Sequence, residues 1–566
     1  MLIIKRLIPQ LRVAALLSLG ACLIGVVPAA MAATPAQTEA AIEEVIVTGS
    51  FIASTPEDAA LPVDVITRET LQEQGSPDII ALISSIPAMS GGNIGQSNRF
   101  LGTAAQGTAT VNLRGLGIQR TLPLLNGQRM AETTAAGDIA YVDVSQIPLA
   151  AIGQVEVLKT GASVTYGSDA IAGVVNFKTR RDLEGFEVSG AYEDIENSNG
   201  DYGGSVAYGW NNDSGNVLFV ADYARTSEIR LFDFDYMKPK PPGQGDGISG
   251  AANPGTYFTV VNPVDADGDG ALEPGTAQGV AFRDLGCTEL GAAILSATSC
   301  TYPFVWQESP VNDENRYHLF AETNWEFSDT LRFHVESHYA YTQIPHNRVS
   351  VTLSSTQFPT PIEASGGSTG GGTSPFPARG GDLQSRFYIP ATNPGLVALL
   401  TDGGCPFADP TICSNGLANG LITSQTGWRP AAMGGSPLFD GDTDPQKNKN
   451  TAWRISGGFE GDFANEWGWS TRLTYAHNTA RAAASDLSVN RVQLGLRGLG
   501  GAGCNEKTGT PGVGPCQWLN PFANSITSSI VNGLSYAQAV GRAQGPTNSK
   551  SLWGWMRDTQ QVEVVS

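Results

Sequence analysis

The sequence predicts a transmembrane antiparallel β-barrel preceded by a small α/β domain. After residue 182, apolar and polar side chains alternate along several segments, as in strands that present one face to lipid. The connections between these segments alternate between tight turns and stretches of many tens of residues. Beyond residue 32, no segment offers the roughly 18 uninterrupted apolar residues of a membrane helix, so any membrane span is expected to be a closed barrel.

Composition agrees with a chain rich in turns and long loops. The 566 residues include 67 Gly and 33 Pro, and only 16% are charged. The formal charge of −20 argues against a nucleic-acid partner. It fits either a solvated acidic surface or an acidic lumen that attracts cations.

The first 32 residues read as a secretion signal. Basic residues precede an apolar run over 13–27, and Ala30-Met31-Ala32 supply the small residues that a signal peptidase reads. A lipoprotein signal at Cys22 is the alternative, although the apolar run continues past it to the better cleavage site. The sequence therefore predicts export.

Residues 33–60 are expected to be a docking segment and linker. They contain an isolated β-branched run with no helical period, which is suited to add as a strand to another protein's sheet. The alternative is that Val45 to Thr48 forms the first strand of a globular domain. The residues expected to dock are Glu44, Val45, Ile46, Val47, Thr48 and Gly49.

Residues 61–182 have the pattern of a compact α/β domain. A strand is expected at 62–66, and helices are expected at 68–74 and 78–85. The Asn126-Gly127 pair predicts a tight hairpin turn.

Three ordered runs in this domain resemble the plug domain of the TonB-dependent outer-membrane receptors. They are VNLRGLGIQRTLPLLNGQR at 111–129, IPLAAIGQVEVLKTG at 147–161 and YGSDAIAGVVNF at 166–177. Thr160 departs from the pattern, because many relatives carry an acidic or arginine residue there. By the same resemblance, the docking run is the TonB box, which an inner-membrane energy-transducing complex grips.

The resemblance also implies roles for individual plug residues. Arg114 would meet carboxylates of the barrel wall and hold the plug shut until it is pulled, and the alternative is an exposed arginine. Glycines in the three runs permit tight turns and close backbone approach, so they are expected to be structural. These glycines are Gly115, Gly117, Gly161, Gly167 and Gly173.

Residues 183–566 are assigned to the N-terminal part of the barrel. About eight strands are expected in it, the last within 551–564, and aromatic residues near their ends suggest interfacial girdles. The resemblance implies about 22 strands, so the barrel is expected to be only partly present. The long connections, at 228–314, 343–450 and 481–548, are expected to be extracellular.

Each long connection contains one pair of cysteines, so the proposed disulfides would all lie on one side of the membrane. Six cysteines allow 15 pairings, and pairing between near neighbours is the simple expectation. Disulfides suit an oxidising periplasm. The cysteines are Cys287, Cys300, Cys405, Cys413, Cys504 and Cys516.

Two clusters of polar residues are candidates for contact with a ligand or an ion. His334, Glu336 and His338 share one strand face, but about 13 Å separates the two histidines, so they are expected to line a wet lumen instead of binding one metal. Whether they contact ligand stays open. The same holds for a calcium-like run that lacks the bidentate glutamate, made of Asp265, Asp267 and Asp269.

These observations predict an energy-coupled outer-membrane receptor, with no catalytic residues, no bound metal and no cofactor. The resemblance implies four ligand classes, namely ferric siderophores, cobalamin, haem and glycans. Its expected partners are the periplasmic TonB protein, outer-membrane lipid and a small extracellular ligand. The alternatives are a passive porin or adhesin barrel and, much less favoured, a secreted enzyme.

Overall fold

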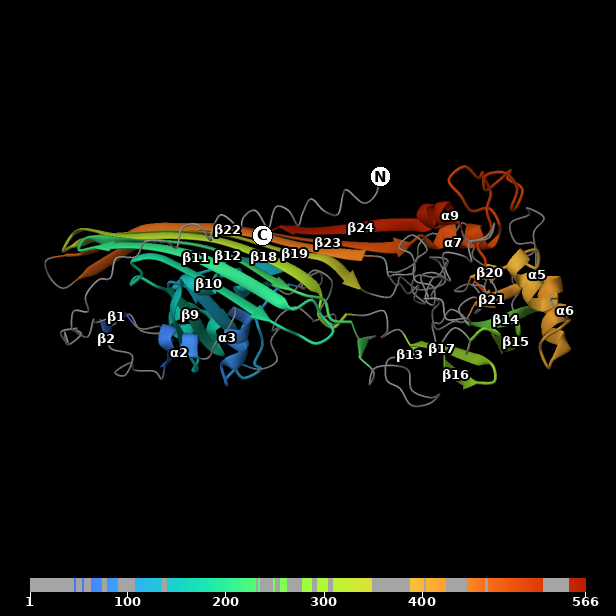
Figure 1. The fold of residues 1–566 in the computed structure, drawn as a ribbon, viewed down its shortest axis with the longest axis horizontal. Helices are drawn as coiled ribbons and strands as arrows, with labels where there is room; N and C mark the ends of the chain where they lie inside the picture. Colours follow the sequence, from blue (N-terminus) through green and yellow to red (C-terminus); the bar gives the residue numbers. More distant parts are fainter. Residues whose placement is uncertain are drawn as a thin grey trace, which may run out of the picture.

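The structure is a computed structural model, and it describes residues 45–46, 53–54, 63–73, 79–89, 107–134, 140–230, 233–234, 248–249, 255–261, 277–287, 293–303, 309–348, 387–401, 404–423, 445–463, 467–522 and 549–565. Figure 1 shows a small domain lying beneath a long, curved sheet, with a third group of short elements at one end of that sheet. Among the described residues, no helix combines the length and apolar character needed to cross a membrane.

The small domain is built on a five-stranded mixed sheet. Its order is β3 (Val63–Thr67), β8 (Ile152–Leu158), β9 (Gly173–Thr179), β4 (Thr121–Leu125) and β5 (Gln128–Arg129). β4 and β9 pair in parallel, and the other neighbours are antiparallel. The α/β domain predicted from the sequence is therefore confirmed.

Helices α2 (Arg68–Glu73) and α3 (Ile79–Ser85) begin and end within a residue of their predicted bounds. α3 buries Ile79, Leu82 and Ile83 because apolar residues recur along one of its faces. The remaining elements are short: β6 (Glu132–Thr134), β7 (Ala140–Val142), α4 (Ser163–Tyr166) and the 3-10 helices η3 (Val144–Gln146), η4 (Leu149–Ala151) and η5 (Ser168–Ala170).

The large sheet has eight strands, each antiparallel to the next. They are β10 (Gly185–Glu193), β11 (Asp201–Asn212), β12 (Gly215–Thr226), β18 (Asp313–Ser328), β19 (Leu331–Arg348), β22 (Pro445–Asp462), β23 (Gly468–Leu487) and β24 (Arg557–Val565). The antiparallel strands predicted from the alternating pattern are thus confirmed, and β10 and β24 form the two edges of the sheet.

The two ends of this sheet differ. Connections of a few residues, at 213–214, 329–330 and 463–467, lie at one end, which we call the short-turn end. The long connections leave from the opposite end, which we call the long-connection end. β1 (Val45–Ile46) and β2 (Ala53–Ser54) lie near the short-turn end (Figure 1).

The two faces of the sheet also differ, because successive side chains of a strand point to opposite sides. On β18, Phe320 and Glu322 are buried on the inward face, whereas Tyr317 and Leu319 are exposed on the outward face. The inward face shares one hydrophobic core with the small domain, to which it contributes Ala207, Leu218, Val220 and Phe320. The small domain is therefore packed against the inside of the curved sheet.

The long connections contain secondary structure that the sequence did not predict. They form β13 (Ile248–Ser249), β14 (Thr256–Val261), β15 (Ala277–Arg283), β16 (Ala293–Ser296), β17 (Ser299–Pro303), β20 (Tyr388–Ile389), β21 (Leu421–Thr423), α5 (Pro394–Thr401), α6 (Pro410–Asn419), α7 (Val489–Leu496) and α9 (Lys550–Met556). Residues 551–556, expected to begin the last strand, instead belong to α9, which buries Leu552, Trp553 and Met556.

Elements from all three long connections share one core, and we call this assembly the loop module. Tyr257, Leu396 and Leu496 each come from a different connection and are all fully buried in it. Three disulfides lie in the module and join near neighbours in sequence: Cys287–Cys300, Cys405–Cys413 and Cys504–Cys516.

Candidate functional site

The hairpin turn of the small domain contacts the inward face of the large sheet. Asn126 and Gly127 both have positive φ, 50° and 75°, which closes the tight β4–β5 turn. Asn126 Nδ2 donates to Glu336 Oε2 at 2.5 Å and lies 3.5 Å from Glu322 Oε2. Its Oδ1 accepts from the backbone N–H and the hydroxyl of Thr179, at 3.0 and 3.1 Å. One side chain thus links the turn both to its own domain and to the sheet.

Glu322 and Glu336, which we call the wall carboxylates, are 3% and 1% exposed. Arg454 pairs with Glu336 and is itself 1% exposed. His334 Nε2 lies 3.3 Å from Glu336 Oε2, and Asn324 Nδ2 donates to Glu322 Oε1 at 2.8 Å. Buried carboxylates require such partners, because an uncompensated buried charge is strongly destabilising.

The histidines predicted to line a wet lumen are enclosed. His334, Glu336 and His338 share the inward face as expected, but they are only 7%, 1% and 6% exposed. Both carboxylate oxygens of Glu336 accept hydrogen bonds, one from Arg454 and one from Asn126. Within the described parts of the chain, no group of three or more His, Cys, Asp or Glu is arranged to hold a metal ion.

A second charged contact joins the small domain to the sheet near the short-turn end. Arg68 Nη2 donates to Glu187 Oε1 at 2.6 Å, and Arg180 Nη1 donates to Glu187 Oε2 at 2.9 Å. Arg68 Nη1 also donates to the carbonyl of Ile152 at 3.1 Å. Burial and the neighbouring Arg180 lower the pKa of Arg68. Two arginines of the small domain therefore share one carboxylate of β10.

Arg114, expected to meet barrel-wall carboxylates, makes a different contact. Its φ is 56°, the side chain is exposed, and Nη2 donates to the carbonyl of Ala172 at 3.0 Å, within the same domain. In the described residues the ion pairs to the sheet come from Arg68 and Arg180. The left-handed backbone at Arg114 belongs to the turn before β4 and directs the guanidinium back onto the domain.

The glycines singled out in the sequence occupy turns and close contacts. A Cβ at Gly173 would overlap the carbonyl oxygen of Leu158 and lie 2.7 Å from Leu113 Cδ1, and its φ is 139°. Only glycine fits there, at the start of β9. Gly115, Gly117 and Gly167 also have positive φ, and a Cβ at Gly161 would lie 3.2 Å from the Ile171 carbonyl.

Asp143, a buried acid, lies between β7 and η3. Asp143 Oδ1 accepts from Ala109 N at 2.9 Å, Ser145 N at 3.0 Å and Ser145 Oγ at 2.6 Å. Burial raises the pKa of Asp143, and its hydrogen bonds to Ser145 and Ala109 oppose that rise. Burial also raises the pKa of nearby Tyr141 to about 12. Asp143 therefore caps η3 and ties it to the strand-like segment at Ala109.

The docking segment is described only in part. Val45–Ile46 (β1) pairs with Ala53–Ser54 (β2) in a two-stranded sheet. Glu44 and residues 47–49 lie outside the described residues. The calcium-like run lies outside them as well, namely Asp265, Asp267 and Asp269.

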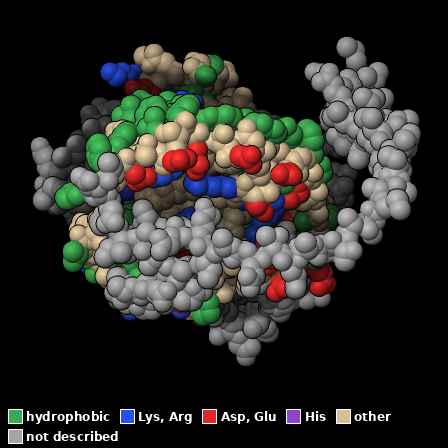
Figure 2. Space-filling view, turned by 90° about the vertical axis from the view of Figure 1, so that its left-hand side faces the viewer, with side chains coloured by type: hydrophobic (Ala, Val, Ile, Leu, Met, Phe, Trp, Pro, Cys, Tyr) green, Lys and Arg blue, Asp and Glu red, His purple; other side chains and the backbone are tan. Residues whose placement is uncertain are grey.

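Figure 2 views the molecule from the short-turn end. Hydrophobic side chains follow the convex outer side, whereas acidic and basic side chains gather on the concave side beneath. The polar inward residues of β18 belong to this concave side: Glu314, Arg316, His318 and Glu322. The sequence did not predict these contacts of Asn126, Thr179, Glu322 and Arg454. The available signal was the run of polar residues at alternate positions of β18, which Phe320 interrupts.

Comparisons with known proteins support the identity of the small domain. Residues 55–174 match the family model described as "TonB-dependent Receptor Plug Domain". The chain is also 31% identical over 145 residues to the "Iron-regulated outer membrane virulence protein" of Vibrio cholerae, covering 25% of this chain and 21% of that relative.

Solved receptor structures are similar to the chain at low sequence identity. The ferric enterobactin receptor PfeA is 12% identical, with a TM-score of 0.35, and the match covers 80% of this chain and 44% of PfeA. The siderophore receptor PirA from Acinetobacter baumannii is 15% identical, with a TM-score of 0.33, covering 74% and 40%. The chain thus spans less than half the length of these relatives.

Proposed function

We propose that this chain, which carries a TonB-dependent receptor plug domain at residues 55–174, acts in an energy-coupled outer-membrane receptor for a scarce extracellular ligand. The observation that carries the proposal is the seating of that plug domain, by buried polar contacts, on the concave side of an eight-stranded antiparallel sheet. Members of this family are transporters and not enzymes.

We place the eight strands in the outer membrane, after cleavage of the signal, with the long-connection end outside the cell. Aromatic residues on the outward face form two rows, as expected at the two membrane interfaces. Near the long-connection end, Tyr223 and Tyr317 have ring centroids 4.9 Å apart. Near the short-turn end, Trp210 stacks on Trp325 at 6.0 Å. The disulfide-containing loop module then lies in the oxidising extracellular space.

The ligand class we favour is a ferric siderophore or another iron complex, with cobalamin and glycans as the other candidates. The support is the nature of the similar proteins, which are an iron-regulated outer-membrane protein and siderophore receptors. Ligand would bind on the loop module and the outer side of the plug. Growth on single sources of iron, cobalamin or glycan, with and without the gene, identifies the ligand.

We further propose that the wall carboxylates hold the plug in its closed position. Glu322 and Glu336 bind the Asn126 turn, while Glu187 binds Arg68 and Arg180. Pulling on the TonB box, Glu44 to Gly49, would have to break these contacts before ligand could pass. The outer membrane has no ion gradient of its own, so the inner-membrane potential, about 2.3 kcal/mol per charge per 100 mV, supplies the work through TonB.

The competing function is a passive porin or adhesin barrel, which would not need a docking peptide. Deleting residues 43–49 separates the two. An energy-coupled receptor keeps its ligand binding and loses uptake, whereas a passive pore keeps both. Deleting an equal number of linker residues from 33–39 is the matched control and leaves uptake unchanged.

A further inference from the structure

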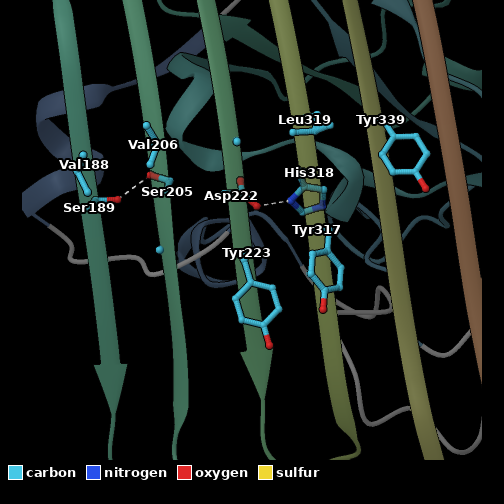
Figure 3. A pocket seen from close by; sticks show the side chains of 12 residues that line it. Val188, Ser189, Ser205, Val206, Asp222, Tyr223, Tyr317, His318, Leu319 and Tyr339 are labelled. Carbon is cyan, nitrogen blue, oxygen red and sulfur yellow. Dashed lines mark hydrogen bonds and ion pairs between the residues drawn. The ribbon is translucent and has the colours of Figure 1, made fainter. Parts of the chain in front are cut away.

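A hollow lies on the outward face of the sheet, on the side away from the plug. Its volume is about 510 Å³, and residues of β10, β11, β12, β18 and β19 line it (Figure 3). Its floor is Gly204 and Ala221, whereas large apolar side chains form its walls. Val206 and Leu319, on either side of that floor, are 43% and 48% exposed.

Strand register explains why the surface is hollow there. Ala221 pairs with Val206 on one side and with Leu319 on the other, and Gly204 pairs with Tyr223. Gly204 and Ala221 both lie at outward positions and are diagonal neighbours on adjacent strands, so two of the smallest residues are surrounded by large ones. The depression is therefore built into the sequence of three adjacent strands.

The polar residues that line the hollow are turned away from it. Asp222 and His318 bond to each other at 2.7 Å on the inward face, and Ser189 and Ser205 do the same at 2.7 Å (Figure 3). The space itself is consequently bounded by apolar side chains and tyrosine rings. An occupant that fits it must be apolar along its length.

The long-connection end of the hollow is polar and carries an ion pair. Tyr223 OH donates to Asn315 Oδ1 at 2.9 Å. Arg225 pairs with Asp313 at 3.2 Å and lies 5.9 Å from the ring centroid of Tyr202. An apolar trough with hydroxyls and a guanidinium at one end matches an amphiphile whose chain lies in the trough and whose anionic headgroup lies at that end.

We propose that the hollow binds one acyl chain of a phosphorylated, multiply acylated glycolipid of the outer leaflet, with its headgroup beside Arg225 and Tyr223. The inference rests on the proposed membrane orientation, in which the long-connection end faces the cell exterior. Arg225, which also pairs with Asp313, would donate to the phosphate of that headgroup. Bound lipid would be an integral part of this face of the receptor.

The test uses the membrane-inserted protein, exposed to vesicles that contain lipid A and phospholipid and then extracted into detergent. Native mass spectrometry counts the lipids that stay bound. Ala221→Phe fills the hollow, and Leu473→Phe adds the same ring at an outward position on β23 that is 80% exposed. We expect the wild type and Leu473→Phe to keep one lipid A per chain, and Ala221→Phe to keep at least tenfold less.

Equal retention by all three proteins overturns the proposal, as does retention of phospholipid alone or a second protein copy in place of lipid. If Ala221→Phe does not fold, Val206→Ala combined with Leu319→Ala removes both walls and must lower retention in the same way. Uptake is measured separately. A variant that loses lipid but keeps energy-dependent uptake leaves the proposed receptor function intact. Failure of the lipid-binding proposal can therefore be distinguished from failure of the receptor function.

Discussion

Asn126 of the plug and Glu336 of β19 are joined by a hydrogen bond of 2.5 Å, although 210 positions separate them in the chain. Glu336 also pairs with Arg454 of β22. The plug turn is therefore hydrogen-bonded to a buried ion pair of the sheet. Hydrogen bonds to a charged group contribute about 1.5–3 kcal/mol, more than neutral ones. This contact is therefore well suited to hold the plug in place.

Replacing Glu336 with alanine should strongly destabilise the protein. Arg454 would be left as a buried cation without its carboxylate, which costs about 3–5 kcal/mol. Denaturant unfolding of the purified protein measures the loss. Glu563→Ala is the matched control, because the exposed Glu563–Arg481 pair should contribute under about 1 kcal/mol. An equal loss of unfolding free energy in the two variants would contradict the role of Glu336 as the partner of a buried cation.

Asn126→Asp should loosen the plug without unfolding it. The substitution places a third carboxylate against Glu322 and Glu336, and like charges at this distance repel. We expect hydrogen exchange in the β4–β5 hairpin to rise about tenfold, equivalent to about 1.4 kcal/mol.

Asn126→Gly controls for the loss of hydrogen bonds, since glycine also accepts the positive φ of this turn. Its exchange should rise less than that of Asn126→Asp. Restoring slow exchange by combining Asn126→Asp with Glu322→Gln, which leaves the Glu336–Arg454 pair in place, would assign the effect to repulsion. If the wild type, Asn126→Asp and Asn126→Gly exchange at the same rate, the wall carboxylates do not hold this turn.

Asp143 should make the stability of the plug depend on pH. Burial raises its pKa above the ordinary value of 3.8, so the folded state holds its proton more tightly than the unfolded state. The contribution of Asp143 to stability is therefore fully present below pH 3.8 and is lost as the pH rises through the raised pKa. Asp143→Asn keeps the acceptor oxygen and should flatten this part of the pH profile of Tm.

Asp143→Ala is the contrasting variant, because it removes the acceptor for three hydrogen bonds. Each donor that is left buried and unpaired costs about 1–3 kcal/mol. Its Tm should be lower than that of Asp143→Asn at every pH. An unchanged pH profile in Asp143→Asn would show that Asp143 does not carry the effect.

Removing the Cys504–Cys516 disulfide should destabilise the loop module and spare the plug. A crosslink that closes a loop of this size contributes about 3 kcal/mol. In the double serine variant, we expect faster hydrogen exchange in α7 and unchanged exchange in β8 and β9. Faster exchange in both places would mean that the two cores do not open independently.

Some of this architecture could be predicted from the sequence and some could not. β18 and β19 were predictable because period-two alternation persists over a dozen residues or more. The loop module was not, because each of three separate connections supplies only part of its core. The Arg454–Glu336 pair depends on the register of β19 against β22, which no local pattern specifies.

The resemblance to receptor plugs located the domain, but Arg114, the residue it implied as the latch, bonds within that domain in the described structure. It pointed to Arg114, whose left-handed backbone turns the side chain toward Ala172. The contacts to the sheet come instead from Asn126, Arg68 and Arg180. A side chain's partner depends on local backbone geometry, which a matching motif does not report.

Energy coupling is the central claim, and the initial rate of ligand uptake before and after collapse of the inner-membrane potential tests it most directly. We expect uptake by the wild type to fall to the level of surface binding when the potential is collapsed. Ile46→Pro, which removes a backbone N–H from the docking strand, should be at that level throughout, while Ile46→Val should match the wild type. Uptake that persists without the potential, or that is unaffected by Ile46→Pro, would contradict the account.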